Sequence, residues 1–143
     1  MNNLELMKPW ILQGAWSMSL PADRAMQMVA AGDIGAFVAL AFARPAEFVG
    51  HALELAGDEL TMLQVADTLS RAIGRAVYFN ELPLEQTRAF DANLAKLCEW
   101  MATHSFVADL PSLRTLLPGL QTLETWLTNN GWRQPAGATR SNA

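Results

Sequence analysis

Apolar and polar residues alternate most regularly in the middle of the chain, where an apolar residue recurs every third or fourth position over residues 62–73. Such spacing places the apolar side chains on one face of a helix. The members of this stripe are Met62, Val65, Ala66, Leu69 and Ile73. Thr61 precedes the run and Gln64 follows three residues later, which is the spacing of a capping box. With Gly74 as a C-terminal stop, the pattern predicts a helix over residues 62–73.

Three other long segments also show helical spacing. The first covers residues 4–16 and carries Leu4, Leu6, Met7, Trp10, Ile11 and Trp16. The second begins at Asp33, a residue type that caps helix N-termini, and ends before Arg44. Its expected stripe is Ile34, Phe37, Val38, Ala41 and Phe42. The third follows Pro83, and its expected stripe is Phe90, Leu94, Leu97, Cys98 and Met101.

Two short helices are expected near the C-terminal end of the chain. One begins at Asp109 and is closed by Pro118 and Gly119. The other begins near Thr122 and ends at Gly131. A left-handed conformation of Gly131 would bring Trp132 against Leu127, which is the hydrophobic contact of a Schellman motif.

Three short runs are predicted as strands: residues 26–30, 52–56 and 76–80. The last run contains Val77, Tyr78 and Phe79, which favour strands, and the middle run alternates weakly. The sequence thus predicts an α+β fold of about three short strands and about six helices. Because no linker composition interrupts residues 4–132, we expect one domain over residues 1–132 and a flexible polar tail over residues 133–143.

The composition restricts the classes of function. With 143 residues, 51% of them hydrophobic, the chain can bury a sizeable core. A net charge of −4 argues against direct binding of nucleic acid, which needs a basic surface. The longest apolar run, residues 34–43, is far shorter than the roughly 20 residues that span a membrane. A single cysteine, Cys98, and no visible secretory signal favour the cytoplasm. His51 and His104 lie at no metal-ligand spacing, so no metal site is predicted.

Several short segments, taken in order, resemble one known family. They are Met1-Asn2-Asn3, Asp33-Ile34-Gly35, Leu53 to Thr61, Gly74-Arg75, Leu82-Pro83-Leu84, Cys98-Glu99-Trp100, Pro118-Gly119-Leu120 and Asn130-Gly131-Trp132. Their shared order and spacing resemble the C-terminal, substrate-side part of the NmrA-like family, a branch of the atypical short-chain dehydrogenase/reductase superfamily. The resemblance covers the chain from Met1 to Trp132.

The resemblance implies the C-terminal portion of a Rossmann-like protein whose full-length members bind NADP or NAD. Dinucleotide binding depends on a glycine-rich turn that brings a helix N-terminus to the pyrophosphate. The sequence contains no such G-x-x-G-x-x-G segment, and its nearest glycine pair, Gly32 and Gly35, accompanies a helix start. The single tyrosine, Tyr78, has no lysine four residues later, so no catalytic residues carry over. We therefore expect no cofactor to bind this chain alone.

Candidate contact residues follow from the resemblance and from helical spacing. The resemblance places Asn2 and Asn3 near the nicotinamide end of a cofactor, if a cofactor half is present; alternatively the pair is solvated or caps the first helix. Met7, Trp100 and His104 are candidates for a substrate cleft. Trp100 and His104 are four residues apart on one helix. The alternative is that this tryptophan covers an apolar surface with the histidine at its edge.

Three functions follow from these observations. The first is a truncated NmrA-like protein, a substrate-side fragment without independent catalysis. The second is an NAD(P)H-dependent oxidoreductase or redox-sensing regulator whose cofactor half is not part of this sequence. The third is an interaction module that forms a homodimer, or binds a separate nucleotide-binding chain, through the apolar face of residues 4–16. An in-frame glycine-rich segment in the DNA ahead of the start codon would favour the second.

Overall fold

The computed structural model describes residues 1–132, so the expected tail over residues 133–143 lies outside the described part of the chain. The fold is α+β, as predicted, and residues 1–132 form eight helices and four strands. The helices are α1 (Leu4–Ile11), α2 (Ala31–Ala43), α3 (Pro45–Phe48), α4 (Met62–Ile73), α5 (Leu84–Phe90), α6 (Ala92–Thr103), α7 (Leu110–Leu116) and α8 (Leu123–Asn129). The strands are β1 (Ala15–Met18), β2 (Ala25–Met28), β3 (Asp58–Thr61) and β4 (Tyr78–Glu81).

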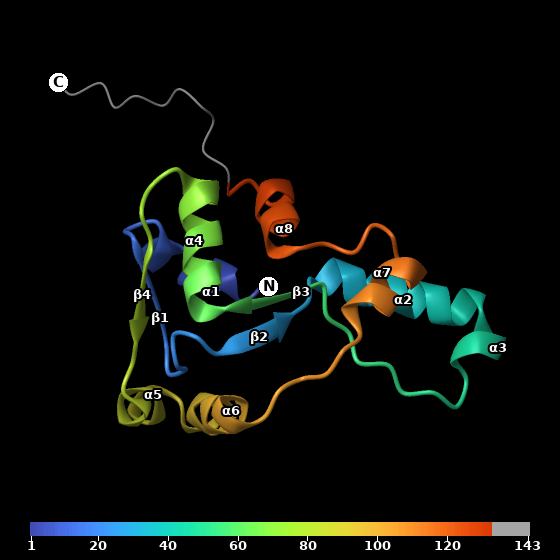
Figure 1. Ribbon diagram of the computed structural model, residues 1–143, viewed down its shortest axis with the longest axis horizontal. Helices are drawn as coiled ribbons and strands as arrows, with labels where there is room; N and C mark the ends of the chain where they lie inside the picture. The colour runs from blue at the N-terminus through green and yellow to red at the C-terminus, as the bar shows by residue number, and fades with distance from the viewer. Residues whose placement is uncertain (133–143) are drawn as a thin grey trace.

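The strands form two separate two-stranded sheets. β1 pairs with β4 in parallel, with Ala15 opposite Tyr78. β2 pairs with β3 antiparallel, with Ala25 opposite Thr61. Parallel strands need a long connection, and here residues 19–77, which include the second sheet and α2 to α4, provide it. Figure 1 shows α2, α3 and α7 grouped at one end of the molecule, away from the β1–β4 pair.

Helix α4 has every local feature that predicted it. Gln64 N–H donates to Thr61 Oγ1 at 3.2 Å, and Thr61 N–H donates to the Gln64 side chain at 2.8 Å. Gly74 ends the helix in the left-handed conformation, with φ of 71°. All five residues of the predicted stripe are buried in the main core, which also receives side chains from α1, β1, α6 and α8. The prediction of a helix over residues 62–73 is confirmed.

The C-terminal Schellman motif is also confirmed. Gly131 has φ of 70°, Trp132 N–H donates to Leu127 O at 3.0 Å, and Gly131 N–H donates to Thr128 O at 3.3 Å. Trp132 and Leu127 are both buried in the main core. Trp132 Nε1 also donates to Glu5 of α1 at 2.6 Å. The C-terminal end of the described chain is therefore fixed to its beginning.

The first helix is shorter than the predicted span of residues 4–16. α1 ends at Ile11, and Gly14 then adopts a φ of 94°. A Cβ atom at Gly14 would lie 2.9 Å from Ala76 O, so a larger residue would obstruct the approach to β4. Tyr78 N–H donates to Gly14 O at 2.9 Å. Trp16 therefore lies on β1, a strand that was not among the three predicted. No local sequence pattern indicates its pairing with a distant segment.

The predicted strand over residues 52–56 is wrong. These residues have no regular secondary structure, and the strand lies instead at Asp58–Thr61. The strand forms where β2 provides a partner, and there the side chain of Gln27 donates to Glu59 Oε2 at 2.8 Å. The predicted strands over residues 26–30 and 76–80 correspond to β2 and β4, with shifted boundaries.

Two predicted stripes are only partly buried. α2 begins at Ala31 rather than after Asp33, and it buries Phe37 in a second, smaller core against α7, whereas Phe42 is 83% exposed. Ile34 and Val38 are exposed as well. The predicted helix after Pro83 is two helices that meet at Asp91, so Phe90 ends α5 and is exposed. α6 buries Ala95, Cys98 and Met101, whereas Leu94 and Leu97 are exposed. In both helices the stripe contains more apolar residues than the available neighbours cover. No helix within residues 1–132 is long and apolar enough to cross a membrane.

Candidate functional site

The predicted cofactor contacts, Asn2 and Asn3, lie just before α1 at the start of the chain, and Asn2 also reaches α2. Asn2 Oδ1 accepts a hydrogen bond from Ala31 N–H at 2.8 Å and so satisfies one donor at the N-terminus of α2. The Met1 ammonium donates to Val29 O at 2.8 Å, and burial lowers the pKa of this amino group. Asn3 occupies the N-cap position of α1, is exposed and makes no side-chain cap hydrogen bond. The Asn2 oxygen is therefore engaged within the chain, while the side chain of Asn3 faces solvent.

Two of the three predicted cleft residues come together on α6. The rings of Trp100 and His104 stack with centroids 5.1 Å apart and planes 6° apart. Phe106 adds a third ring, 5.1 Å from Trp100 and tilted by 54°. His104 Nδ1 lies 2.9 Å from Thr103 Oγ1 and 3.2 Å from Trp100 O, which leaves Nε2 as the nitrogen available to a ligand. We call Trp100, His104 and Phe106 the aromatic ledge.

A guanidinium group holds the ledge in position. Arg24 Nε donates to Met101 O at 2.8 Å, and Arg24 Nη2 donates to His104 O at 2.6 Å and to Ser105 Oγ at 3.0 Å. The last carbonyl groups of a helix carry partial negative charge, so a cation at this end stabilises it. The arrangement joins the start of β2 to the end of α6. Arg24 lies 77 residues from Met101 in sequence, and no local pattern indicated the contact.

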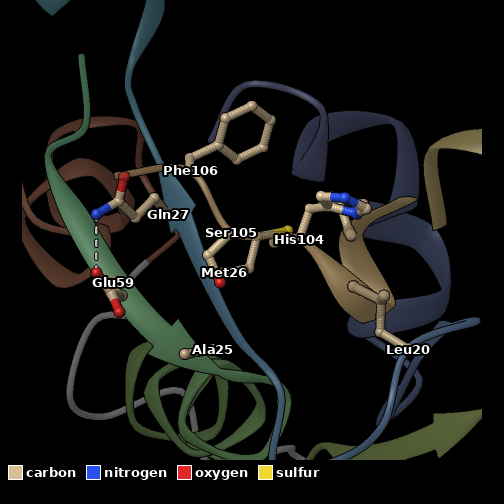
Figure 2. A pocket seen from close by; sticks show the side chains of 9 residues that line it. Leu20, Ala25, Met26, Gln27, Glu59, His104, Ser105 and Phe106 are labelled. Atoms are coloured by element: carbon tan, nitrogen blue, oxygen red, sulfur yellow. Dashed lines mark hydrogen bonds between the residues drawn. The ribbon is translucent and has the colours of Figure 1, made fainter. Parts of the chain in front are cut away.

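The space beside the ledge is a small hollow, shown in Figure 2. Gln27 and Glu59 lie on one side of it and His104 on the other, with Ser105 between them. The hollow has a volume of about 10 Å³, which is room for about one water molecule. The Gln27 side chain at its edge is fixed in place, because it accepts from Ala108 N–H at 3.0 Å and donates to Ala108 O at 3.1 Å. A planar ligand would therefore lie on the ledge rather than enter the hollow.

Met7 does not join the other two predicted cleft residues. Its side chain is half-buried against the main core, and it is not among the residues that line the hollow. Met7 and the aromatic ledge belong to different surroundings, so the structure brings together only Trp100 and His104. Phe106 was missed by the sequence prediction because it lies in the loop after α6, beyond the helical spacing.

A second, larger hollow of about 550 Å³ lies where β1 and β4 end. Ser19 and Glu81 line it from the strand ends, and Cys98 and Glu99 line it from α6. Burial raises the pKa of the Cys98 thiol, while a hydrogen bond from the Ser19 backbone acts in the opposite direction. This thiol is therefore protonated and weakly nucleophilic at neutral pH. Within residues 1–132 no group of three or more metal-ligating side chains is assembled.

Comparison with solved structures gives the same fold at low sequence identity. A nucleoside-diphosphate-sugar epimerase from Staphylococcus aureus matches with a TM-score of 0.68 and 18% identity, over 87% of this chain and 48% of its own. NmrA, a negative transcriptional regulator solved with NADP, matches with a TM-score of 0.59 and 18% identity, over 79% of this chain and 41% of its own. NmrA solved with NAD matches with a TM-score of 0.61 and 19% identity, over 82% of this chain and 46% of its own.

The chain thus spans less than half the length of the solved relatives it matches. No curated protein sequence matches it significantly. The family model of the NmrA-like family matches residues 1–113, which is most of the chain. This match includes α1 to α6, the aromatic ledge and the Asn2–Asn3 pair. The chain therefore belongs to the NmrA-like family.

Proposed function

We propose that this chain is the substrate-side region of an NmrA-like NAD(P)-binding protein and has no catalytic activity by itself. The observation that carries the proposal is the asymmetry of coverage: the chain is matched over 79–87% of its length, yet it accounts for only 41–48% of the solved relatives. Of these relatives, NmrA was solved with NADP and with NAD. A nucleotide-binding half, in the same polypeptide or in a separate one, would supply the dinucleotide site.

The chemistry of the chain supports this division of roles. Phosphate groups of a dinucleotide are held by backbone N–H groups of a glycine-rich turn at a helix N-terminus, and the sequence contains no G-x-x-G-x-x-G segment. At the N-terminus of α2, Asn2 Oδ1 engages Ala31 N–H. In the presence of a nucleotide-binding half, Asn2 would contribute its amide N–H groups and Asn3 its whole side chain to the nicotinamide end of the cofactor.

The aromatic ledge is the part of the chain that we propose to contact substrate. Stacked rings favour planar, unsaturated ligands through offset stacking, and His104 Nε2 adds one hydrogen-bonding group beside them. We propose that the protein acts in the cytoplasm. The complete protein is then either an NAD(P)H-dependent reductase or a regulator that binds the cofactor without turnover. A measurement of NADPH oxidation by a protein that contains both halves distinguishes these two functions.

We propose that the nucleotide-binding half packs on α1. Leu4 and Ile11 are buried in the main core, but Leu6 is 77% exposed and Trp10 is 61% exposed. Burying such side chains stabilises a complex by roughly 1.5–3 kcal/mol each. A Trp10→Glu variant should therefore weaken binding of the nucleotide-binding half without unfolding the chain.

Titration calorimetry with NADPH tests the main proposal. The isolated chain should give no binding heat at micromolar concentrations, while a protein that also contains the nucleotide-binding half should bind. Micromolar affinity of the isolated chain would contradict the proposal, because it would require a dinucleotide site among the residues of this chain. Asn3→Ala, measured in the complete protein, should lower affinity if this side chain contacts the cofactor.

A further inference from the structure

The larger of the two hollows lies at the carboxyl ends of β1 and β4, and we call it the strand-end hollow. It begins just past the hydrogen bond that Leu82 N–H donates to Met18 O at 3.0 Å. Figure 1 shows β4 leading into α5, with α6 beside α5. In open α/β sheets, ligands bind outside the carboxyl ends of parallel strands. The volume of about 550 Å³ also lies within the roughly 300–1,000 Å³ that is typical of small-molecule pockets.

Most of the wall of the strand-end hollow is apolar. The apolar residues that line it are Pro21, Leu82, Pro83, Leu84 and Ala102. Leu82 and Leu84 are half-buried, so they form walls of the hollow rather than a protruding patch. Cys98 is only 1% exposed, and its thiol already has a partner in the Ser19 backbone. The hollow therefore suits a ligand with a compact hydrocarbon body.

The polar groups of the strand-end hollow are hydrogen-bond acceptors. Glu81 is exposed and has no ion-pair partner among the residues that the structure describes. Glu99 accepts from Arg88 Nη2 at 2.6 Å. Ser19 Oγ lies 2.6 Å from Thr87 Oγ1, which is buried and fixes the position of this hydroxyl group. Within residues 1–132 no lysine or arginine lines the hollow, so its polar side favours a cation.

We propose that the strand-end hollow binds a small, protonated primary amine with an aliphatic body. An ammonium group has three donors and no acceptor, and the hollow offers acceptors on Glu81, Glu99 and Ser19. The hydrocarbon body lies against the apolar wall, where its removal from water stabilises the complex. The two carboxylates repel anionic ligands, so the site is distinct in its chemistry from a dinucleotide site.

The lining of the hollow favours a small ligand over a protein segment. The centres of protein interfaces are depleted of charged residues, because a buried charge without a partner is costly. A covering segment would bury Glu81, whereas an amine supplies the compensating charge itself.

The amine site is also separate from the aromatic ledge. Cys98 and Ala102 are four residues apart and share one face of α6. Trp100 lies two residues after Cys98, which is about 200° around the helix. The two sites therefore use different faces of α6, and the amine site does not rest on the proposed function.

Titration of the isotope-labelled chain with cyclohexylamine, followed by NMR at neutral pH, tests the site. Its aliphatic ring does not stack on the aromatic ledge as a planar ring does, and its amine is protonated at this pH. The amides of residues 19, 82, 98 and 99 should shift and saturate, with a dissociation constant of about a millimolar for so small a ligand. Cyclohexanol has the same shape without the charge and should bind at least about fivefold more weakly. Cyclohexanecarboxylate, an anion, should not bind.

Two glutamate variants locate the charge that the amine uses. Glu81→Gln should weaken binding of cyclohexylamine at least about fivefold and leave binding of cyclohexanol unchanged. Glu85→Gln is the matched control, because it removes the same charge and a partner of the same Arg88, yet Glu85 does not line the hollow. It should change the affinity by less than about twofold, since solvent and salt screen a more distant charge.

The proposal is overturned if the amine and the alcohol bind equally well, or if no amide shift saturates. Saturating shifts confined to other parts of the chain also overturn it. Equal effects of Glu81→Gln and Glu85→Gln have the same consequence, because they would show attraction to the net negative charge of the chain rather than to this hollow.

Discussion

Replacing Asp33 with alanine should destabilise the fold more than any change to an exposed ion pair. Asp33 lies in the first turn of α2 and is only 6% exposed. Its carboxylate accepts from Gln121 N–H at 3.0 Å and from Gln121 Nε2 at 3.1 Å, which joins α2 to the segment before α8. A hydrogen bond to a charged group contributes about 1.5–3 kcal/mol. In Asp33→Ala both bonds are lost, but Gln121 is half-buried, so water can satisfy part of what its donors lose. We therefore expect the free energy of unfolding to fall by about 2–4 kcal/mol.

Urea denaturation followed by tryptophan fluorescence measures this loss, at protein concentrations low enough to exclude dimers. Asp33→Asn keeps the shape and one acceptor, so it should lose roughly half as much as Asp33→Ala. Asp67→Ala is the control, because Asp67 and Arg71 form an exposed pair on α4; it should change stability by less than about 1 kcal/mol. Equal effects of Asp33→Ala and Asp67→Ala would refute the reasoning.

Four further predictions concern stability. Leu69→Ala, at a position with no exposed surface, should lower the free energy of unfolding by about 2–5 kcal/mol in urea denaturation. Thr61→Ala removes the capping box of α4 and should lower it by about 1 kcal/mol. Gly131→Ala forces a side chain into φ of 70° and should lower the melting temperature, whereas Gly35→Ala, within α2 and with no neighbour near its added Cβ, should not. Asp109 accepts from the Ser112 side chain and backbone, which lowers the pKa of this carboxyl group. The folded pKa of Asp109 lies below the unfolded value of about 3.9, so the ionised carboxylate stabilises the fold above that pH and this stabilisation is lost in stronger acid. The stability difference between wild type and Asp109→Ala should therefore stay constant from neutral to mildly acidic pH and vanish in strong acid.

The sequence determined the elements whose signals are local. The helix over residues 62–73 follows from a capping box, a stripe and a terminal glycine, all within 14 residues of each other, and the structure contains each of them. The Schellman motif at Gly131 is equally local, because its hydrogen bonds join residues at most five positions apart. The likeness to the NmrA-like family rests on the same short segments and is confirmed by the family match over residues 1–113.

Tertiary structure decided which strands exist and which apolar faces are covered. Trp16 lies on a strand because Gly14 allows β1 to approach β4, more than 60 residues away in the sequence. Residues 52–56 have a weak strand pattern but no strand beside them, so they remain unpaired in the isolated chain.

The candidate site shows the same division. Helical spacing placed Trp100 beside His104, but Phe106 and Arg24 joined them through the loop after α6 and through β2. A stripe of apolar residues shows which face of a helix can be buried. In α2 and α6 the neighbouring elements determine how much of that face is buried. Strand pairing and burial both depend on contacts between residues far apart in sequence. A pattern along the chain does not indicate which distant segment will pack against a given strand or helix.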